Sequence, residues 1–153
     1  MKSDRIPINR QTRETSISGF LTEDASVRRI VTPIPVFSHF LDQLVFYSGL
    51  GLDLDARDLV PADDHHVVED TALAIGDALN TWFGDRTGCQ RFGQYWLPMD
   101  DALALAALDI GGRSGFWFRG RFRRDAVGGL AVENILHFFR SLTHAARFTL
   151  HLR

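Results

Sequence analysis

Apolar residues recur with two different periods along the chain, and the period predicts the type of each element. Alternating or short apolar runs, which are typical of strands, occupy residues 15–21, 27–32, 50–60, 102–110, 115–119 and 148–152. Apolar positions at helical spacing occupy residues 36–48, 64–83 and 130–146. The first two strands are expected to form a pair around a turn at 22–24, and Gly84 is expected to close the second helix.

The order of these elements is nearly the same in both halves of the chain. The first half reads strand, strand, helix, strand, helix, and the second half repeats this order up to His151. We therefore predict a duplicated α/β fold, an α+β two-layer arrangement that lacks the last helix of its second repeat. Without that helix, apolar side chains of the second sheet lose a covering layer, which favours association or aggregation. These side chains are Leu103, Leu105, Ala107 and residues 116–118.

Length and composition indicate one domain with a real core. The chain has 153 residues, of which 45% are hydrophobic and 24% charged. No segment approaches the ~20 apolar residues of a membrane span, and the first residues lack the apolar run of a signal peptide. The single cysteine, Cys89, cannot form an internal disulfide, which fits a reducing compartment. We expect a cytoplasmic protein without a membrane partner.

The net charge of −2 hides an asymmetry between the two halves. Residues 113–153 contain eight arginines against Asp125 and Glu133, a net charge of +6, so the rest of the chain carries −8. A basic region in an acidic protein suits a phosphate or carboxylate ligand better than a nucleic acid, which normally requires a strongly basic domain. Arg121, Arg123 and Arg124 can equally serve packing and solubility.

The segment DDHHVVED at 63–70 places two adjacent imidazoles and a carboxylate at the opening of the second helix. Glu69 lies one turn beyond His65 and His66, so one histidine and the carboxylate can bind a single cation. The other histidine points about 100° away around the helix axis, toward a second metal or ligands from elsewhere in an assembly. Asp63 and Asp64 are candidate N-caps. The alternative is a polar helix start with two solvated histidines.

The other histidines differ in what they suggest. His39 shares a helix face with Gln43, and a lone histidine on such a face is more often a core residue than a ligand. His151 lies on the polar face of the last strand. His137 and His144, seven residues apart in the third helix, suggest surface or packing roles and are assigned no chemistry.

Seven motifs occur in the order seen in imidazoleglycerol-phosphate dehydratases, a family that the chain resembles from about residue 10 to its last residue. They are RQTRET at 10–15, TPIP at 32–35 before His39, DHHVVED at 64–70, RFG at 91–93, PMDDAL at 98–103, LDIGGR at 108–113 and TLH at 149–151.

The resemblance implies a hydro-lyase, a carbon–oxygen lyase of histidine biosynthesis that converts imidazole glycerol phosphate to imidazole acetol phosphate. It implies two manganese ions per site, with other divalent metals as alternatives, and a homo-oligomer with sites between subunits. It also implies one domain over 1–153, with a first repeat at about 10–84 and an incomplete second repeat at about 90–153. Each repeat would be a four-stranded sheet backed by helices, a half-fold also found in ribosomal and kinase proteins. No nucleic acid or membrane is expected as a partner.

The same resemblance assigns roles to individual residues. The implied metal ligands are His39, His65, His66, Glu69 and His151. Glu14 and Gln43 would contact the substrate, with Glu14 as the first candidate for general acid or base. Arg91 and Arg113 would bind the phosphate, because a guanidinium offers a planar fork to phosphate oxygens.

The chain also departs from the family pattern, which leaves alternatives open. Ser38 stands where the family usually has an Asp that would orient His39, Tyr47-Ser48 replaces a His-Gly pair, and Gly112 and Ser114 replace a Ser and a Pro. A family segment with a second His-His-x-x-Glu motif and a Ser-x-Lys phosphate clamp would follow Arg153. One alternative is therefore a non-catalytic metal-binding or assembly remnant. An interaction module fits the histidine cluster poorly, and an unrelated zinc hydrolase would need a His-Glu-x-x-His motif or a cysteine pairing that the sequence lacks.

Overall fold

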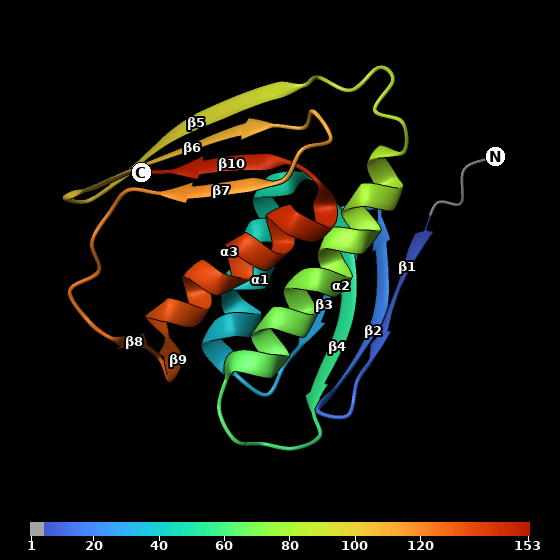
Figure 1. Ribbon diagram of the computed structural model, residues 1–153, viewed down its shortest axis with the longest axis vertical. Coiled ribbons are helices and arrows are strands. Elements are labelled where there is room, and N and C mark those ends of the chain that lie inside the picture. Colours follow the sequence, from blue (N-terminus) through green and yellow to red (C-terminus); the bar gives the residue numbers. More distant parts are fainter. Residues whose placement is uncertain (1–4) are drawn as a thin grey trace.

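The computed structural model, which describes residues 5–153, consists of two four-stranded sheets and three helices (Figure 1). Sheet 1 contains, in spatial order, β1 (Arg5–Gln11), β2 (Thr15–Thr22), β4 (Gly51–Asp58) and β3 (Arg28–Val31). Sheet 2 contains β5 (Phe92–Met99), β6 (Ala102–Asp109), β10 (Thr149–Leu152) and β7 (Gly115–Phe118). The helices are α1 (Pro35–Ser48), α2 (His65–Phe83) and α3 (Val132–Ala146).

The two sheets are built in the same way, which confirms the predicted duplicated fold. In each sheet the first two strand pairings are antiparallel, and the last pairing is parallel. The parallel pairing follows a helical crossover in both cases, through α1 in the first half and α3 in the second.

The predicted elements lie where the sequence pattern places them, to within a few residues, with one wrong pairing and three omissions. The predicted pairing of β2 with β3 is wrong, because β4 lies between these two strands. The sequence pattern missed β1, β5 and a short hairpin of β8 (Ala126–Val127) and β9 (Leu130–Ala131). β1 contains Pro7, and β5 contains Gly93 and Pro98, which are turn signals that a sheet tolerates in edge strands.

The core lies between the sheets, and α2 runs through its centre. Val67, Val68 and Ala72 of α2 are at most 1% exposed. They belong to one apolar cluster with Ile17 of β2 and Leu142 of α3. None of the helices among residues 5–153 is both long and apolar enough to cross a membrane.

The register of sheet 2 shows which side chains face the helices. Leu150 of β10 is buried and lies opposite Leu108 of β6, so Leu108 and the alternating alanines before it form the inner face. Leu103 and Leu105 therefore point away from the helices. The expectation that these leucines lost a helical cover is wrong. Instead, the inner face of β5 is uncovered within the described residues, with Leu97 46% exposed.

The crossing of α2 and α3 depends on a glycine. A Cβ atom added to Gly76 would lie 2.6 Å from the Cβ of Ala145 and 2.9 Å from the carbonyl oxygen of Leu142. These distances are far below van der Waals contact, so the two helix backbones can approach this closely only because residue 76 has no side chain.

We predict that Gly76→Ala lowers the free energy of unfolding by about 1–3 kcal/mol through overpacking, although alanine is the better helix former by about 1 kcal/mol. Urea unfolding followed by circular dichroism measures the change. Asp77→Ala, at the next and exposed helix position, is the matched control and should change stability by no more than about 0.5 kcal/mol. A stabilised Gly76→Ala variant would contradict the close helix approach.

Candidate metal centre and its surroundings

The first residues of α2 are tied to the start of α3. The backbone N–H of His65 donates to the Asp63 carboxylate (2.9 Å), so Asp63 takes the capping role. Asp64, the formal N-cap residue, makes no capping hydrogen bond to its own helix. Its carboxylate accepts hydrogen bonds from the backbone N–H of Ala131 (2.7 Å) and from the side-chain amide of Asn134 (2.8 Å). Asp64 therefore joins the openings of both helices.

This connection also orients the imidazole of His65. A carboxylate only accepts hydrogen bonds, so the NH₂ group of Asn134 must face Asp64. The amide oxygen of Asn134 then faces Nδ1 of His65 at 3.1 Å. Nδ1 is therefore the donor, and in the neutral imidazole Nε2 of His65 is then the nitrogen with a free lone pair. Metal-binding histidines are commonly oriented by a hydrogen bond of this kind.

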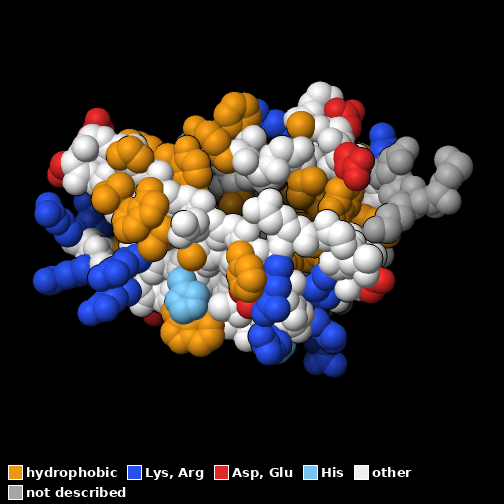
Figure 2. Space-filling view, turned by 90° about the horizontal axis from the view of Figure 1, so that it is seen from above, with side chains coloured by type: hydrophobic (Ala, Val, Ile, Leu, Met, Phe, Trp, Pro, Cys, Tyr) orange, Lys and Arg blue, Asp and Glu red, His pale blue; other side chains and the backbone are white. Residues whose placement is uncertain are grey.

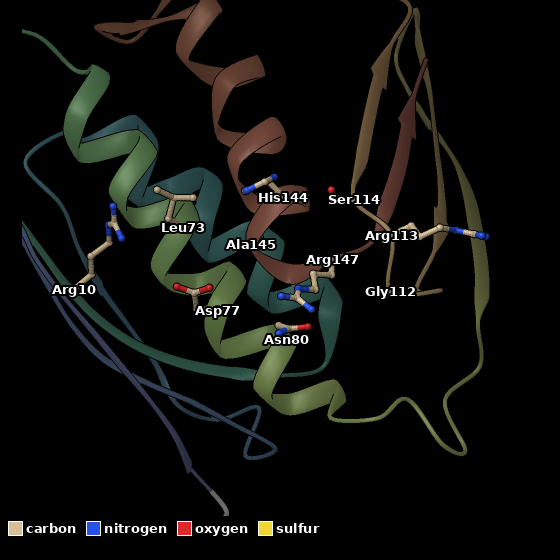
Figure 3. A pocket seen from close by; sticks show the side chains of 10 residues that line it. All are labelled: Arg10, Leu73, Asp77, Asn80, Gly112, Arg113, Ser114, His144, Ala145 and Arg147. Atoms are coloured by element: carbon tan, nitrogen blue, oxygen red, sulfur yellow. The ribbon is translucent and has the colours of Figure 1, made fainter.

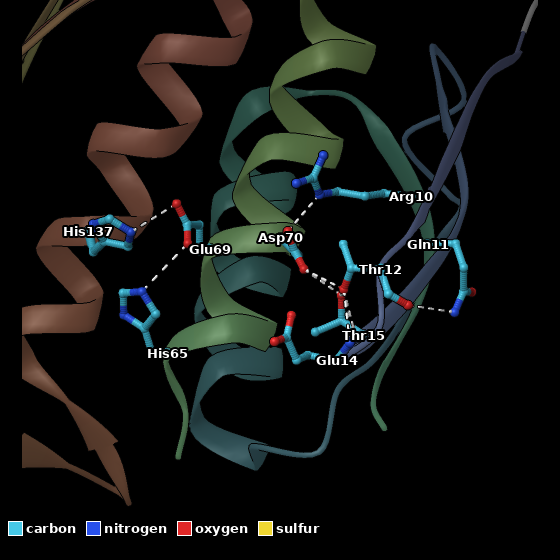
Figure 4. Close-up of polar contacts among 9 residues, drawn as sticks. All are labelled: Arg10, Gln11, Thr12, Glu14, Thr15, His65, Glu69, Asp70 and His137. Atoms are coloured by element: carbon cyan, nitrogen blue, oxygen red, sulfur yellow. Dashed lines mark hydrogen bonds and ion pairs between the residues drawn. The ribbon is translucent and has the colours of Figure 1, made fainter. Parts of the chain in front are cut away.

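Three side chains converge beside this lone pair (Figure 4). Nε2 of His65 lies 3.5 Å from one oxygen of Glu69, and Nε2 of His137 lies 3.3 Å from the other oxygen. The two imidazoles stack with ring centroids 4.7 Å apart. Among residues 5–153 this is the one group of three or more potential metal-ligand side chains whose donor atoms all lie within 4.8 Å of one another.

Sequence reasoning assigned His137 no chemistry, although one signal could have identified it. His39-Phe40 lies on α1, and His137-Phe138 lies on α3. The two helices hold corresponding places in the repeats, because α1 leads from β3 to its parallel partner β4 and α3 lies between β7 and its parallel partner β10. The distance between His137 and Glu69 depends on how α3 packs on α2, which motif spacing within one helix does not reveal.

The remaining histidines that the family pattern implicates do not belong to this group of converging ligands. The ring of His66 lies edge-on to that of His65, with 5.6 Å between centroids and 75° between planes, but His66 is not one of the three converging ligands. His39 is exposed on α1 and therefore is not a core residue. Nearby Gln43 donates to Asp42 at 3.5 Å. His151 lies exposed on sheet 2, stacked on Trp117. The structure therefore brings together His65 and Glu69 of the five implied ligands.

Glu14 lies in the turn between β1 and β2, and Asp70 anchors that turn to α2 (Figure 4). The Asp70 carboxylate accepts hydrogen bonds from Nε of Arg10 (2.6 Å), from Oγ1 of Thr15 (2.6 Å) and from Oγ1 of Thr12 (3.3 Å). Thr12 in turn accepts the backbone N–H of Glu14 at 3.2 Å. Asp70, the residue next to Glu69, thus holds in place the turn that carries Glu14, the candidate general acid or base.

The pKa of Asp70 reflects two opposing effects. Burial of the carboxyl raises its pKa, but the hydrogen bonds from Thr15, Arg10 and Thr12 and the charge of Arg10 together lower the pKa below its usual value. The charged form is therefore favoured in the folded protein. Asp70 contributes stability above its unfolded pKa of about 3.9, and that contribution is lost as the pH falls through the lower folded pKa.

The two candidate phosphate-binding arginines lie near the end of β6, with Arg91 already engaged. Nε and Nη2 of Arg91 donate to the two oxygens of Asp109 at 2.7 and 3.0 Å. This bidentate pair lowers the pKa of Asp109 and raises that of Arg91. Arg113 follows the end of β6 by four residues, and its charge also lowers the pKa of Asp109. The guanidinium of Arg113 has no hydrogen-bond or ion-pair partner within residues 5–153, and Figure 3 shows it directed away from the helices.

An open polar cavity of about 600 Å³ lies between the later turns of α2, the end of α3 and the β6–β7 loop (Figure 3). Arg10, Arg147, Asp77 and His144 line it, as does Arg113, although the guanidinium of Arg113 points away from the helices. His65 is absent from this lining and lies at the opposite end of α2. The cavity and the three-residue cluster are therefore separate parts of the surface.

Comparison with known proteins gives consistent matches. The family model described as imidazoleglycerol-phosphate dehydratase matches residues 32–153. The imidazoleglycerol-phosphate dehydratase of Caldivirga maquilingensis is 43% identical over 95% of this chain and 76% of its own length. A histidine biosynthesis bifunctional protein of Legionella pneumophila is 44% identical over 97% of this chain, which spans 42% of that relative.

Two solved structures share the fold. The crystal structure of imidazoleglycerol-phosphate dehydratase from Staphylococcus aureus superposes with a TM-score of 0.82 at 32% identity, covering 95% of this chain and 81% of its own. The enzyme from Pyrococcus furiosus gives a TM-score of 0.77 at 30% identity, with 95% and 77% covered.

We predict that Asp70→Asn lowers the free energy of unfolding at pH 7 by about 2–3 kcal/mol, because charge-assisted hydrogen bonds to a buried carboxylate are lost. The difference from the unsubstituted protein should shrink as the pH falls below about 4. Urea unfolding across a pH series measures both effects. The control is Asp42→Asn, which breaks a surface ion pair with Arg28 and should cost no more than about 1 kcal/mol. Equal losses of stability in the two variants would contradict a larger contribution from the hydrogen bonds of Asp70.

Proposed function

The chain belongs to the imidazoleglycerol-phosphate dehydratase family, the hydro-lyases of histidine biosynthesis, and we propose that His65, Glu69 and His137 hold a divalent metal for this reaction. The observation that carries the proposal is the convergence of two Nε2 atoms on one carboxylate, all within 4.8 Å. His137 supplies further support, because its buried Nε2 atom makes no hydrogen bond among residues 5–153 and has only the Glu69 carboxylate beside it, at 3.3 Å. A buried nitrogen without a hydrogen bond is costly unless another group binds it, and a metal ion held between this nitrogen and the carboxylate would do so.

The donor set fits the metals that the family pattern implies. Two imidazoles and a carboxylate suit manganese, zinc or another divalent ion of similar preference. Three protein ligands leave further coordination positions for substrate or water. We propose manganese as the resident metal, with a second ion served by His39, His66 and His151.

The reaction explains why a metal is needed. The substrate must lose a proton from an unactivated carbon next to its imidazole ring, and then a hydroxyl group. A bound metal would supply the electron sink for the proton loss. We assign proton transfer to Glu14, whose backbone position is fixed through Thr12 and Asp70. Arg91 and Arg113 would hold the phosphate, with Gln43 as a further substrate contact.

We also propose a homo-oligomer in which sites form between subunits. Within one chain the three-residue cluster lies at the start of α2, whereas Arg91 and Arg113 lie near the end of β6. His151 lies exposed on sheet 2, with Trp117 as its aromatic neighbour. Because these groups are spread over the chain, a small substrate can meet all of them only where copies adjoin.

The test of the function is dehydration of imidazoleglycerol phosphate by the isolated chain, followed as imidazole acetol phosphate formation with Mn²⁺ and with a chelator. Turnover that requires metal supports the proposal. Metal binding without turnover would instead favour the alternative of a non-catalytic, metal-binding member of the family.

We predict that His137→Ala reduces the manganese bound per chain, since one of three converging ligand atoms is lost. Equilibrium dialysis followed by metal analysis measures the stoichiometry and the affinity. We expect the affinity to fall by about tenfold or more, because even residues that only orient metal ligands contribute about that much. His144→Ala, on the same helix but exposed, is the matched control and should bind metal normally. Unchanged binding in His137→Ala would remove this residue from the ligand set.

We predict that Arg113→Ala weakens the binding of imidazoleglycerol phosphate by about 1.5–3 kcal/mol, because a charge-assisted hydrogen bond is lost. The dephosphorylated analogue, which lacks the charge that Arg113 would meet, should bind as before. Calorimetry with both ligands measures the difference. Arg123→Ala, at another exposed arginine of the same half, serves as the control. Equal losses for both ligands would mean that Arg113 does not recognise the phosphate.

A further inference from the structure

Asn134 is a buried polar residue in the first turn of α3, and its amide has a partner on each side. The residue is 5% exposed, so its amide has little access to water. The amide nitrogen donates to Oδ1 of Asp64 at 2.8 Å, and the amide oxygen lies 3.1 Å from Nδ1 of His65. Asn134 therefore links the carboxylate of Asp64 to the imidazole of His65.

Asp64 determines which way this amide faces. Among residues 5–153 its carboxylate accepts hydrogen bonds from Asn134 and from the backbone N–H of Ala131, and it forms no ion pair with an arginine. Both helices begin at the end of the molecule away from sheet 2 (Figure 1), whereas the basic side chains in Figure 2 lie on the side of sheet 2. With two neutral N–H donors beside it, the carboxylate is an acceptor toward both.

The direction of these hydrogen bonds passes from Asp64 to His65. If the amide of Asn134 turned by 180°, its oxygen would face Oδ1 of Asp64, and two acceptors would oppose each other. If the imidazole proton moved to Nε2, the lone pair of Nδ1 would face the amide oxygen, again with two acceptors opposed. Either change leaves a part-buried polar atom without its hydrogen bond. The Nδ1–H tautomer of His65 is the one that satisfies all three groups.

The tautomer of His65 decides what its Nε2 atom can do beside Glu69. In the Nδ1–H form, the lone pair of Nε2 faces a carboxylate oxygen of Glu69 at 3.5 Å, and neither atom has a proton to donate. A cation between them would be bound by both atoms. In the Nε2–H form, the imidazole would instead donate to Glu69, and this hydrogen bond would occupy both ligand atoms. One proton therefore separates an open cluster from a closed one.

We propose that Asp64, acting through the amide of Asn134, sets the tautomer of His65 and thereby keeps its Nε2 atom open to a metal. Neither residue belongs to the group of converging ligand atoms, so both are positioning residues. The part of the proposal that concerns metal binding rests on the proposed function, whereas the tautomer is a property of the metal-free chain.

An isosteric change at residue 64 should reverse the hydrogen bonds. In Asp64→Asn, the new amide oxygen can keep the backbone N–H of Ala131, while the new NH₂ group donates toward Asn134. The amide of Asn134 then turns to accept this hydrogen bond and presents its own NH₂ group to Nδ1 of His65. Nδ1 becomes an acceptor, and the proton of the neutral imidazole moves to Nε2.

Exchanging the two side chains should restore the original direction. In the double variant Asp64→Asn/Asn134→Asp, the amide at position 64 donates to the carboxylate at position 134. The other oxygen of that carboxylate accepts the Nδ1–H of His65, which is a common way to orient a metal-binding histidine. The double variant has the same composition and net charge as the unsubstituted chain, so it separates the direction of the hydrogen bonds from total charge.

The first measurement is the affinity for Mn²⁺, from the electron paramagnetic resonance signal of the free ion in titrations of each variant. We expect Asp64→Asn to lower the affinity by about tenfold or more, the effect of residues that orient metal ligands. The double variant should restore the affinity of the unsubstituted chain. Circular dichroism checks that each variant keeps its fold, and a folded double variant that binds as weakly as Asp64→Asn overturns the proposal.

Two controls separate tautomer from charge and from helix packing. Asp63→Asn removes the same charge near the cluster, and asparagine can still cap the backbone N–H of His65. Ala131→Pro removes the other hydrogen bond to Asp64, and the φ of −65° at Ala131 suits proline. Both controls should bind Mn²⁺ as the unsubstituted chain does, although Ala131→Pro loses stability in urea. A loss of affinity in either control equal to that in Asp64→Asn overturns the proposal.

The second measurement is the tautomer itself, in metal-free protein labelled with ¹⁵N-histidine at pH 8, where imidazole side chains are ordinarily neutral. Magic-angle-spinning NMR distinguishes protonated from unprotonated ring nitrogens whatever the size of the assembly, and His65→Gln identifies the signals of His65. We expect Nδ1–H in the unsubstituted chain and in the double variant, and Nε2–H in Asp64→Asn. The same tautomer in all three proteins overturns the proposal.

The two measurements keep this proposal distinct from the proposed function. If the unsubstituted chain binds no Mn²⁺ but Asp64→Asn moves the proton of His65, the proposed function fails and the control of the tautomer stands. If the unsubstituted chain and Asp64→Asn bind Mn²⁺ equally well, the positioning role fails and the metal centre stands.

Discussion

The close crossing of α2 and α3 is the constraint on which the rest of the molecule depends. Gly76 lets the two helices approach. Asp64 and Asn134 join their first turns through hydrogen bonds. At the other end, Nη2 of Arg86 donates to Asn80 of α2 and to the carbonyl oxygen of Ala146 at the end of α3 (2.8 and 3.2 Å). Only with the helices in this position can Glu69, from the first half of the chain, meet His137 from the second.

The sequence predicted the parts of this arrangement that depend on local spacing. The period of apolar residues predicted α2, and the spacing within one helix turn predicted that His65 and Glu69 could share a cation, as their positions in the structure allow. His137 could not be found in this way, because its distance from Glu69 is set by helix packing. Asp70 belongs to the DHHVVED motif, but local spacing assigns it no role. Its hydrogen-bond partners Arg10 and Thr15 lie in strands of the other layer, far from it in the sequence.

The second sheet shows where hydrophobicity alone misleads. β6 alternates leucine with alanine, and the larger leucines were expected to need a helix above them. The register with β10 instead turns alanines toward the helices and Leu103 and Leu105 outward. At β7 the inner side is filled by large aromatic rings, such as Phe116 stacked on Phe139 of α3 with centroids 6.0 Å apart. β6 is apolar on both faces, so the period of its apolar residues does not show which face packs on the helices and which face points outward.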